Sequence, residues 1–289
     1  MKIDTTTALI GAIFLLSSCG GSSSMEPTAA TNPATSIPVL PKAGPLSKWV
    51  PKVTDTWQWQ LHGSINTAYP VSVFDVDLFD APQATIDGFK SQGRRVVCYF
   101  SAGSSENFRV DFKQFLPKDL GNTLAGYDNE RWLDTRSANV RELMKTRLDL
   151  AMAKGCDGVE PDNVDGYDNN PGFPLTPATQ LDFNSFLAAE AHVRGLAIGL
   201  KNDIQQISAL LPIFDFAVNE QCFEKNECAT YAAFVASGKP VFNAEYAPRY
   251  QDNLGGARDT LCKASRSAGF HTLVLPLLLD DSSRYSCDQ

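Results

Sequence analysis

Three carboxylates lie close together in the stretch G-V-E-P-D-N-V-D-G-Y, residues 158–167, where a buried strand is predicted to end. Glu160 and Asp162 are two positions apart, so in an extended strand their side chains point to the same face. A structural core would not collect them, because an unpaired buried charge is strongly penalised. The stretch therefore predicts a strand end that faces a functional site.

Polar residues also follow most of the other predicted strands. Two carboxylates on opposite sides of such a site can hydrolyse a glycosidic bond, one as acid/base and the other as nucleophile or base. We expect the site to be lined by residues of several strand ends, namely Asp75, Asp77, Tyr99, Glu160, Lys201, Asn202, Asn219, Glu245 and Tyr246. For Glu160 and Lys201, a buried structural ion pair remains the alternative.

Other chemistries fit the sequence less well. A nucleophilic Ser or Cys needs a well-placed histidine, and the chain has only three. His192 lies in a predicted helix, and His271 stands at the start of the last predicted strand, the wrong end. His62 follows the first strand, so one alternative stays open, a metal site made of His62, Asp75, Asp77 and Asp162. We expect that no metal is bound.

The elements that must position these residues alternate between strand and helix. Apolar runs predict eight strands, at 56–61, 71–79, 95–102, 156–162, 195–202, 214–221, 239–246 and 271–277. Helical patterns separate several of them, at 84–93, 139–155, 181–195, 229–239 and 257–269. This order is typical of a (β/α)8 TIM barrel, whose chemistry lies at the carboxyl ends of the strands. A doubly wound sheet is the alternative, but no glycine-rich phosphate loop follows the first strand.

Within this pattern the sequence resembles glycoside hydrolase family 114, the endo-α-1,4-polygalactosaminidase type. The resemblance covers the whole domain and rests on an ordered series of motifs. These are W-Q-W-Q-L, V-F-D-V-D-L-F-D, V-V-C-Y-F-S-A-G, G-V-E-P-D-N-V-D-G-Y, G-L-A-I-G-L-K-N, F-A-V-N-E-Q-C and F-N-A-E-Y.

The resemblance implies a (β/α)8 barrel that cleaves partly deacetylated α-1,4-linked N-acetylgalactosamine polymers internally, without a cofactor. Its catalytic pair falls on Asp162 in E-P-D-N and Glu220 in N-E-Q-C, acting by a retaining mechanism. We assign Asp162 as nucleophile and Glu220 as acid/base, with the reverse assignment left open. The alternatives are a non-catalytic polysaccharide-binding barrel and a hydrolase of a different polysaccharide.

The N-terminal segment differs in composition from the rest. Residues 1–18 resemble a secretory signal that ends in L-S-S before Cys19, which predicts lipidation of Cys19. Residues 19–47 are rich in Ser, Thr, Pro and Ala and predict a tether, which leaves 48–289 as the folded domain. We expect an exported, monomeric lipoprotein that touches a membrane only through its anchor. The absence of Asp after Cys19 favours an outer membrane.

Charge and cysteines bear on partners and compartment. The formal net charge of −8 disfavours nucleic acid and suits a cationic polysaccharide. Six cysteines remain besides Cys19, an even number that favours disulfides in an exported protein. We expect Cys222 to pair with Cys228 and Cys262 with Cys287, while Cys98 and Cys156 either pair or stay buried as thiols.

Overall fold

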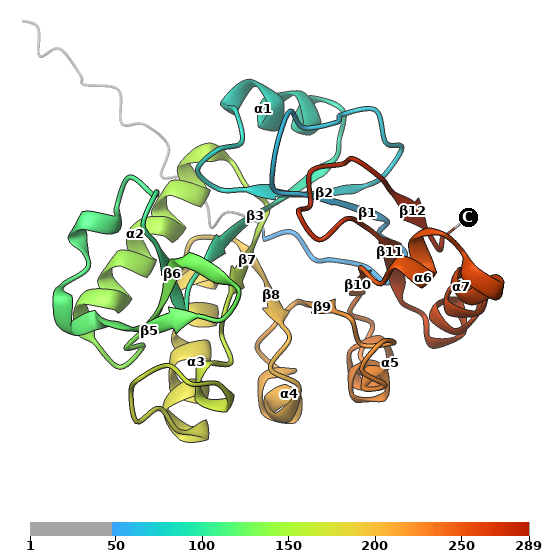
Figure 1. Ribbon diagram of the computed structural model, residues 1–289. Helices are drawn as coiled ribbons and strands as arrows, with labels where there is room; N and C mark the ends of the chain where they lie inside the picture. Colours follow the sequence, from blue (N-terminus) through green and yellow to red (C-terminus); the bar gives the residue numbers. More distant parts are fainter. Residues whose placement is uncertain (1–47, 289) are drawn as a thin grey trace, which may run out of the picture. The chain divides into compact units, whose positions relative to one another are not determined.

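The computed structural model describes residues 48–288, and its main feature is a curled sheet of nine strands (Figure 1). The strand order is β1-β2-β3-β7-β8-β9-β10-β11-β12, and the seven pairings from β1 to β11 are all parallel. The eight parallel strands are β1 (Trp57–Gln60), β2 (Val73–Asp77), β3 (Arg95–Ser101), β7 (Gly158–Asp162), β8 (Ala197–Lys201), β9 (Phe216–Glu220), β10 (Val241–Glu245) and β11 (His271–Val274). Each falls within a predicted strand, and the (β/α)8 architecture is confirmed.

Alternation along these strands divides the apolar residues into two cores. One face of each strand packs inside the barrel, where Trp57, Phe216 and Phe242 belong to one buried cluster. The other face packs against the surrounding helices in a second, larger cluster. A residue's position, odd or even, along its strand therefore decides whether its side chain enters the barrel.

The seam between β11 and β1 is closed by side chains rather than by a ladder among the described strands. The Trp57 indole N–H donates to the carbonyl of His271 at 2.9 Å. The short strand β12 (Tyr285–Ser286) pairs antiparallel with β11. Arg284, just before it, donates to the Trp57 carbonyl at 3.1 Å. The last strands are thus tied to the first.

The helices surround the sheet (Figure 1), and all five predicted helices are present, together with two short helices, Ile207–Leu210 and Pro248–Gln251, that were not predicted. They are α1 (Gln83–Ser91), α2 (Ala138–Lys154), α3 (Pro177–Val193), α4 (Ile207–Leu210), α5 (Ala232–Ala236), α6 (Pro248–Gln251) and α7 (Ala257–Ala268). Gly155 and Gly269 end α2 and α7 with φ of 80° and 74°. Glycine adopts this left-handed conformation without a Cβ penalty, which is why the chain can turn there into the next strand.

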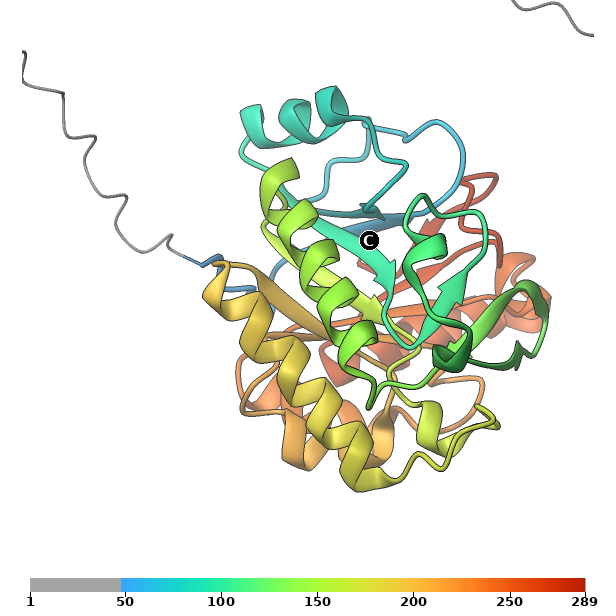
Figure 2. The same cartoon turned by 90° about the vertical axis from the view of Figure 1, so that its left-hand side faces the viewer.

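An insertion after β3 was not predicted as regular structure. β4 (Ser104–Glu106), β5 (Leu120–Leu124) and β6 (Tyr127–Leu133) form a small antiparallel sheet in the order β4-β6-β5. Because β4 begins three residues after the end of β3, this sheet starts at the carboxyl end of the barrel (Figure 2). It is therefore well placed to contribute to a site there.

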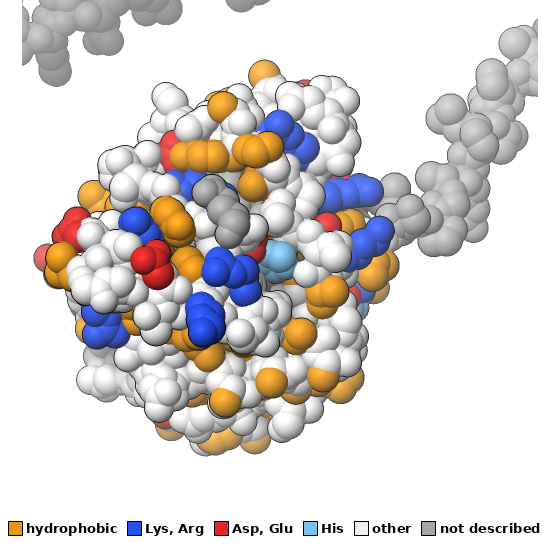
Figure 3. Space-filling view, turned by 90° about the vertical axis from the view of Figure 1, so that its right-hand side faces the viewer, with side chains coloured by type: hydrophobic (Ala, Val, Ile, Leu, Met, Phe, Trp, Pro, Cys, Tyr) orange, Lys and Arg blue, Asp and Glu red, His pale blue; other side chains and the backbone are white. Residues whose placement is uncertain are grey.

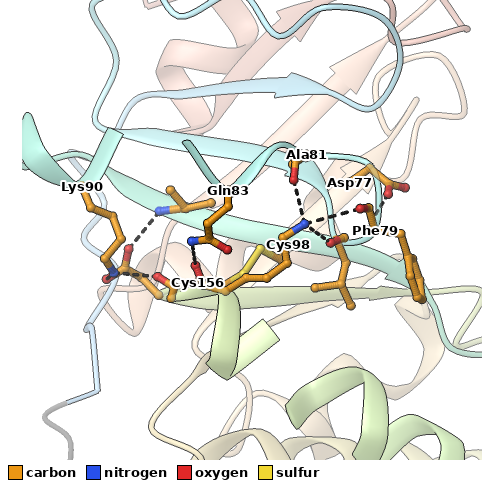
Figure 4. The surroundings of a disulfide bond; sticks show 12 residues. Asp77, Phe79, Ala81, Gln83, Lys90, Cys98 and Cys156 are labelled. Carbon is orange, nitrogen blue, oxygen red and sulfur yellow. Dashed lines mark hydrogen bonds and ion pairs between the residues drawn. A yellow bond between two sulfur atoms is a disulfide. The ribbon is translucent and has the colours of Figure 1, made fainter. Parts of the chain in front are cut away.

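Three disulfides form in the structure: Cys222–Cys228 and Cys262–Cys287, as expected, and Cys98–Cys156, for which the sequence left pairing or buried thiols open. The last of these joins Cys98 in β3 to Cys156, which lies two residues before β7 begins. This disulfide lies beside the loop that follows β2 (Figure 4). Lys154, at the end of α2, donates to the carbonyls of Leu78 and Ala81 in that loop, both at 2.7 Å. The strand that carries Asp162 and its neighbours is thereby fixed by a covalent bond and by backbone contacts.

The face that carries α6, α7 and β12 shows basic and hydrophobic side chains interspersed, with few acidic ones (Figure 3). The negative charge of the chain is therefore not spread evenly over its surface. No helix within residues 48–288 is long and apolar enough to cross a membrane. The predicted signal, Cys19 and the tether lie outside the described residues.

Candidate active site

Lys201 lies at the centre of the carboxyl end of the barrel, between the two predicted catalytic carboxylates. Its Nζ is 3.3 Å from Asp162 Oδ1 and 3.4 Å from Glu220 Oε2. A third contact, of 3.0 Å, joins it to Glu160 Oε1. Burial opposes a charge on Lys201, but the carboxylates of Asp162, Glu160 and Glu220 outweigh it and raise the pKa of Lys201 well above its ordinary value.

Asp162 is held by donors from three directions. Tyr99 on the neighbouring strand β3 donates its hydroxyl to Asp162 Oδ2 at 2.9 Å. The backbone N–H of Asn163 donates to Oδ1 at 2.7 Å, in a left-handed conformation with φ of 59° that Asn tolerates. Burial and the charge of Asp162 raise the pKa of Tyr99 well above its usual range, so Tyr99 keeps its proton. These contacts, together with Lys201, fix the position of the Asp162 carboxyl group.

The loop after β3 fixes this end of β7 from the other side. The N–H groups of Ala102 and Gly103 both donate to the carbonyl of Asp162, at 2.8 and 3.0 Å. A Cβ on Gly103 would lie 1.7 Å from the carbonyl oxygen of Asn163. Only glycine permits this approach, which explains the A-G pair after the third strand.

Glu220 is positioned by β8 and β10. The Asn202 side-chain oxygen accepts from the Glu220 backbone N–H at 3.1 Å. Tyr246 donates its hydroxyl to Glu220 Oε1 at 2.5 Å, and burial together with that carboxylate raises the pKa of Tyr246 well above its usual range. The next residue, Gln221, turns the chain away with φ of 64°. The Glu220 side chain stays 28% exposed, compared with 19% for Asp162 and 2% for Lys201.

The two carboxylates are close together. Since Asp162 Oδ1 and Glu220 Oε2 contact the same nitrogen, at 3.3 and 3.4 Å, these oxygens are at most about 6.7 Å apart. Carboxyl pairs of retaining glycosidases lie about 5–5.5 Å apart and those of inverting enzymes about 6.5–9.5 Å. A limit of about 6.7 Å on this one pair of oxygens is compatible with the retaining distance.

Asp75 and Glu160 lie beneath this pair and have no access to solvent. Asp75 Oδ1 and Glu160 Oε2 are buried without another hydrogen-bond partner, and the two side chains interact with each other. Burial and the neighbouring Glu160 raise the pKa of Asp75 well above its ordinary value. Trp59, 1% exposed, lies beneath Lys201 with its ring centroid 4.7 Å from Nζ, so it packs under the ammonium group rather than presenting a surface for a sugar.

Two residues near the site, Tyr127 and Glu130, were not predicted as site residues. Tyr127 on β6 is 51% exposed, and burial of its hydroxyl and the charges of Glu220 and Asp162 raise its pKa. Glu130, further along β6, accepts from the Ser104 hydroxyl at 2.7 Å. Partial burial, with contributions from Glu106 and Asp162, raises the pKa of Glu130 to about 7. Only the fold of the hairpin, and no local motif, could have placed them here.

Asn219 and Glu245 do not line the site as predicted. Each lies one position away from an inward-facing residue, Glu220 and Tyr246 respectively, so strand alternation turns it to the helix side. Asn219 is fully buried and donates to the Tyr231 hydroxyl at 2.7 Å. Glu245 is also fully buried and accepts from the backbone N–H of Phe223 at 2.8 Å. Both hold the loop that follows Glu220, and neither reaches the site.

Asp77 is also engaged elsewhere. Its carboxylate forms a buried ion pair with Arg109, which binds Glu106 as well, at 2.8 Å. Asp77 Oδ1 additionally accepts the N–H groups of Phe79 and Asp80, both at 2.8 Å. With its oxygens occupied, Asp77 fastens the loop after β2 to the insertion. Asn202, by contrast, touches the site through the backbone of Glu220.

The metal alternative finds no support in the side-chain arrangement. Within residues 48–288, no three His, Cys, Asp or Glu side chains are grouped so as to hold a metal ion. His62 in particular is not gathered with Asp75, Asp77 and Asp162.

Comparison with known proteins agrees with this geometry. A model of the glycoside-hydrolase family GH114 matches residues 40–289. An uncharacterised protein of Deinococcus radiodurans is 25% identical over 313 residues, covering 94% of this chain and 97% of its own length.

Two solved structures are similar in fold. The crystal structure of Aspergillus fumigatus Ega3 in complex with galactosamine has a TM-score of 0.78 and 43% identity, covering 83% of this chain and 98% of Ega3. The glycoside hydrolase domain of PelA from Pseudomonas aeruginosa has a TM-score of 0.62 and 16% identity, covering 78% and 96%, and supports the fold alone. With the family matched over nearly the whole described domain, the chain belongs to glycoside hydrolase family GH114 and is a glycoside hydrolase.

Proposed function

We propose that this glycoside hydrolase cleaves internal bonds of a polymer of α-1,4-linked galactosamine and N-acetylgalactosamine by a retaining mechanism. The observation that carries the proposal is the convergence of Asp162 and Glu220 on Lys201 at the carboxyl end of the barrel. The limit of about 6.7 Å between one pair of their oxygens is compatible with the retaining mechanism, which the family resemblance implies.

In this mechanism Asp162 attacks the anomeric carbon while Glu220 donates a proton to the leaving glycosidic oxygen. The carbon–oxygen bond breaks, and a glycosyl ester forms on Asp162. Glu220, now ionised, removes a proton from water, which attacks the same carbon and releases Asp162 as a carboxylate. Both carboxyl groups accept from a tyrosine hydroxyl and contact Lys201, and Glu220 is the more exposed of the two, so it is the better placed to exchange protons with solvent.

The substrate class rests on two observations. Ega3, with 43% identity, has been crystallised with galactosamine. In this chain, Glu130 on the insertion adds an acidic group that interacts with Asp162 and accepts from Ser104. A nearby ammonium group of the sugar would favour its ionised form. A free amine on the sugar is cationic at neutral pH, so these acidic groups favour a partly deacetylated polymer over a neutral one.

The test is product analysis by mass spectrometry on partly deacetylated α-1,4-galactosaminan, with the 48–289 domain and its Asp162→Asn variant. Short oligomers from the wild type alone support internal cleavage through Asp162. An intact polymer that co-sediments with the wild type supports the non-catalytic binding barrel. An intact polymer that stays in solution, unbound by the protein, overturns the proposal that galactosaminan is the substrate. Cleavage of another glycan would then show that the protein hydrolyses a different polysaccharide.

We further propose that the protein is exported as a monomeric lipoprotein anchored through Cys19, to the outer membrane where the host has one. This rests on the L-S-S-C sequence alone. Metabolic labelling with a fatty acid, followed by membrane fractionation, tests it against Cys19→Ala. Label on both forms, or on neither, contradicts the anchor. Gel filtration of the soluble domain tests the monomer.

A further inference from the structure

Asp75, Glu160 and Lys201 form a buried trio, which the catalytic pair alone does not explain. We propose that this trio sets the charge of the active site: Asp75 stays protonated and donates to Glu160, Glu160 neutralises Lys201, and Lys201 positions Asp162 and Glu220. The inference rests on the proposed roles of Asp162 and Glu220. All members of the trio are positioning residues.

The first step is the position of the proton. Asp75 Oδ1 and Glu160 Oε2 are both inaccessible and lack any other hydrogen-bond partner, although the two side chains contact each other. Two ionised carboxylates in such a place would repel each other, and both oxygens would remain unsatisfied. A single shared proton satisfies both, because one carboxyl then donates to the other.

The second step decides which residue holds that proton. Glu160 Oε1 contacts the Lys201 ammonium group at 3.0 Å, whereas Asp75 forms no ion pair within residues 48–288. The positive charge favours the ionised form of the carboxyl that it touches. Burial raises the pKa of both groups, and Lys201 opposes this more strongly at Glu160. The proton therefore resides on Asp75.

The third step is the balance of charge. Asp75 is neutral in this arrangement, and the negative charge of Glu160 compensates the positive charge of Lys201. The other titratable groups that face the trio are Asp162, Glu220, Tyr99 and Tyr246. Lys201 can then hold the two catalytic carboxylates at a fixed separation without fully neutralising either. One of them can remain a nucleophile while the other carries a proton.

Two isosteric substitutions separate the roles. Asp75→Asn replaces one neutral donor by another, so the pH profile should not move and kcat should fall far less than in Glu160→Gln. Glu160→Gln removes the charge that balances Lys201, so kcat at neutral pH should fall about 100-fold. The limbs of the pH profile should also move to lower pH by about one unit, because the remaining carboxylates lose a negative neighbour. KM should change little in either variant.

Equal losses of kcat in the two variants would overturn the inference, as would an unshifted pH profile for an impaired Glu160→Gln variant. A readout independent of turnover separates this result from failure of the proposed function. In protein labelled with ¹³C at the aspartate carboxyls, one signal should have the shift of a neutral acid at pH 7 and disappear in Asp75→Asn. If the wild type leaves galactosaminan intact but this signal is present, the substrate proposal fails and the protonation of Asp75 stands. Absence of the signal overturns the proposal that Asp75 is protonated in the trio.

Discussion

The two faces of β9 and β10 offer a comparison within one pair of strands. On the barrel side, Glu220 and Tyr246 contact each other at an end of the molecule that solvent reaches. On the helix side, Asn219 and Glu245 are just as polar but fully buried, and they bond to Tyr231 and the backbone of Phe223. Polar burial in a strand therefore does not by itself indicate a catalytic site. What distinguishes the functional face is partial exposure and a shared cation.

The largest effect should come from the exposed face. Asp162→Asn or Glu220→Gln should lower kcat by about 10³-fold, because each removes a group that forms or breaks a bond. The melting temperature should stay within about 3 °C of the wild type, since both side chains are partly exposed. Steady-state kinetics and thermal unfolding check this. A large loss of stability with turnover retained would mean that these carboxylates are structural anchors.

A buried ion pair should show the opposite behaviour. Arg109→Met should destabilise the fold by about 3–5 kcal/mol because it leaves Asp77 and Glu106 buried without a cation. KM of the folded enzyme should not change. Arg136→Met is the matched control: its ion pair with Asp134 is partly exposed, so a loss of about 0–1 kcal/mol is expected. Urea unfolding measures both, and equal losses would refute the distinction.

On the helix side, the buried Glu245 should make the stability of the fold depend on pH. Burial raises the pKa of Glu245 to about 7, above its ordinary value of 4.5, so the folded protein binds a proton more readily than the unfolded chain. The stability linked to this group is complete below pH 4.5 and is lost as the pH rises through 7. Glu245→Gln removes this pH-dependent loss of the free energy of unfolding, which reaches about 3 kcal/mol at high pH.

Melting temperatures of the wild type and of Glu245→Gln should therefore diverge between pH 4 and pH 8, with the variant less sensitive to rising pH. Parallel curves over this range would show that Glu245 does not titrate in the folded state.

The smallest expected effect concerns the insertion. Tyr127→Ala should raise KM about 3- to 10-fold and leave kcat nearly unchanged, because an exposed aromatic ring near the carboxylates supplies packing for a sugar rather than chemistry. Val110→Ala, at a residue 88% exposed on the same insertion, is the control and should change neither constant. A fall in kcat with KM unchanged would instead place Tyr127 in the chemical step.

The sequence predicted the eight strands well because apolar runs and helix-ending glycines such as Gly155 and Gly269 mark their limits. It could not predict which face Asn219 and Glu245 occupy. Their neighbours Glu220 and Tyr246 are also polar, so residue type alone did not show which side chains face the barrel and which face the helices. In β7, by contrast, Glu160 and Asp162 are separated by one residue, and their common face could be inferred directly.

The roles of Tyr127 and Asp77 depend on contacts distant in sequence. Tyr127 approaches the carboxylates only because β6 pairs with β4 after β3. Asp77 is withdrawn from the site by Arg109, 32 positions later in the chain. No local pattern encodes either contact, because both arise when the insertion packs on the barrel.

The way the described chain enters the barrel gives the molecule two poles. Lys48 bonds to Asp215 at 2.6 Å, just before β9 begins, and the Trp49 ring lies 6.1 Å from that of Phe216, the first residue of β9. The entry point is thus at the amino ends of the strands, whereas Asp162 and Glu220 end theirs. The described chain therefore begins at the pole opposite the carboxylates. A partner that bound the domain beside Lys48 would leave Asp162 and Glu220 open to a polymer at the other pole.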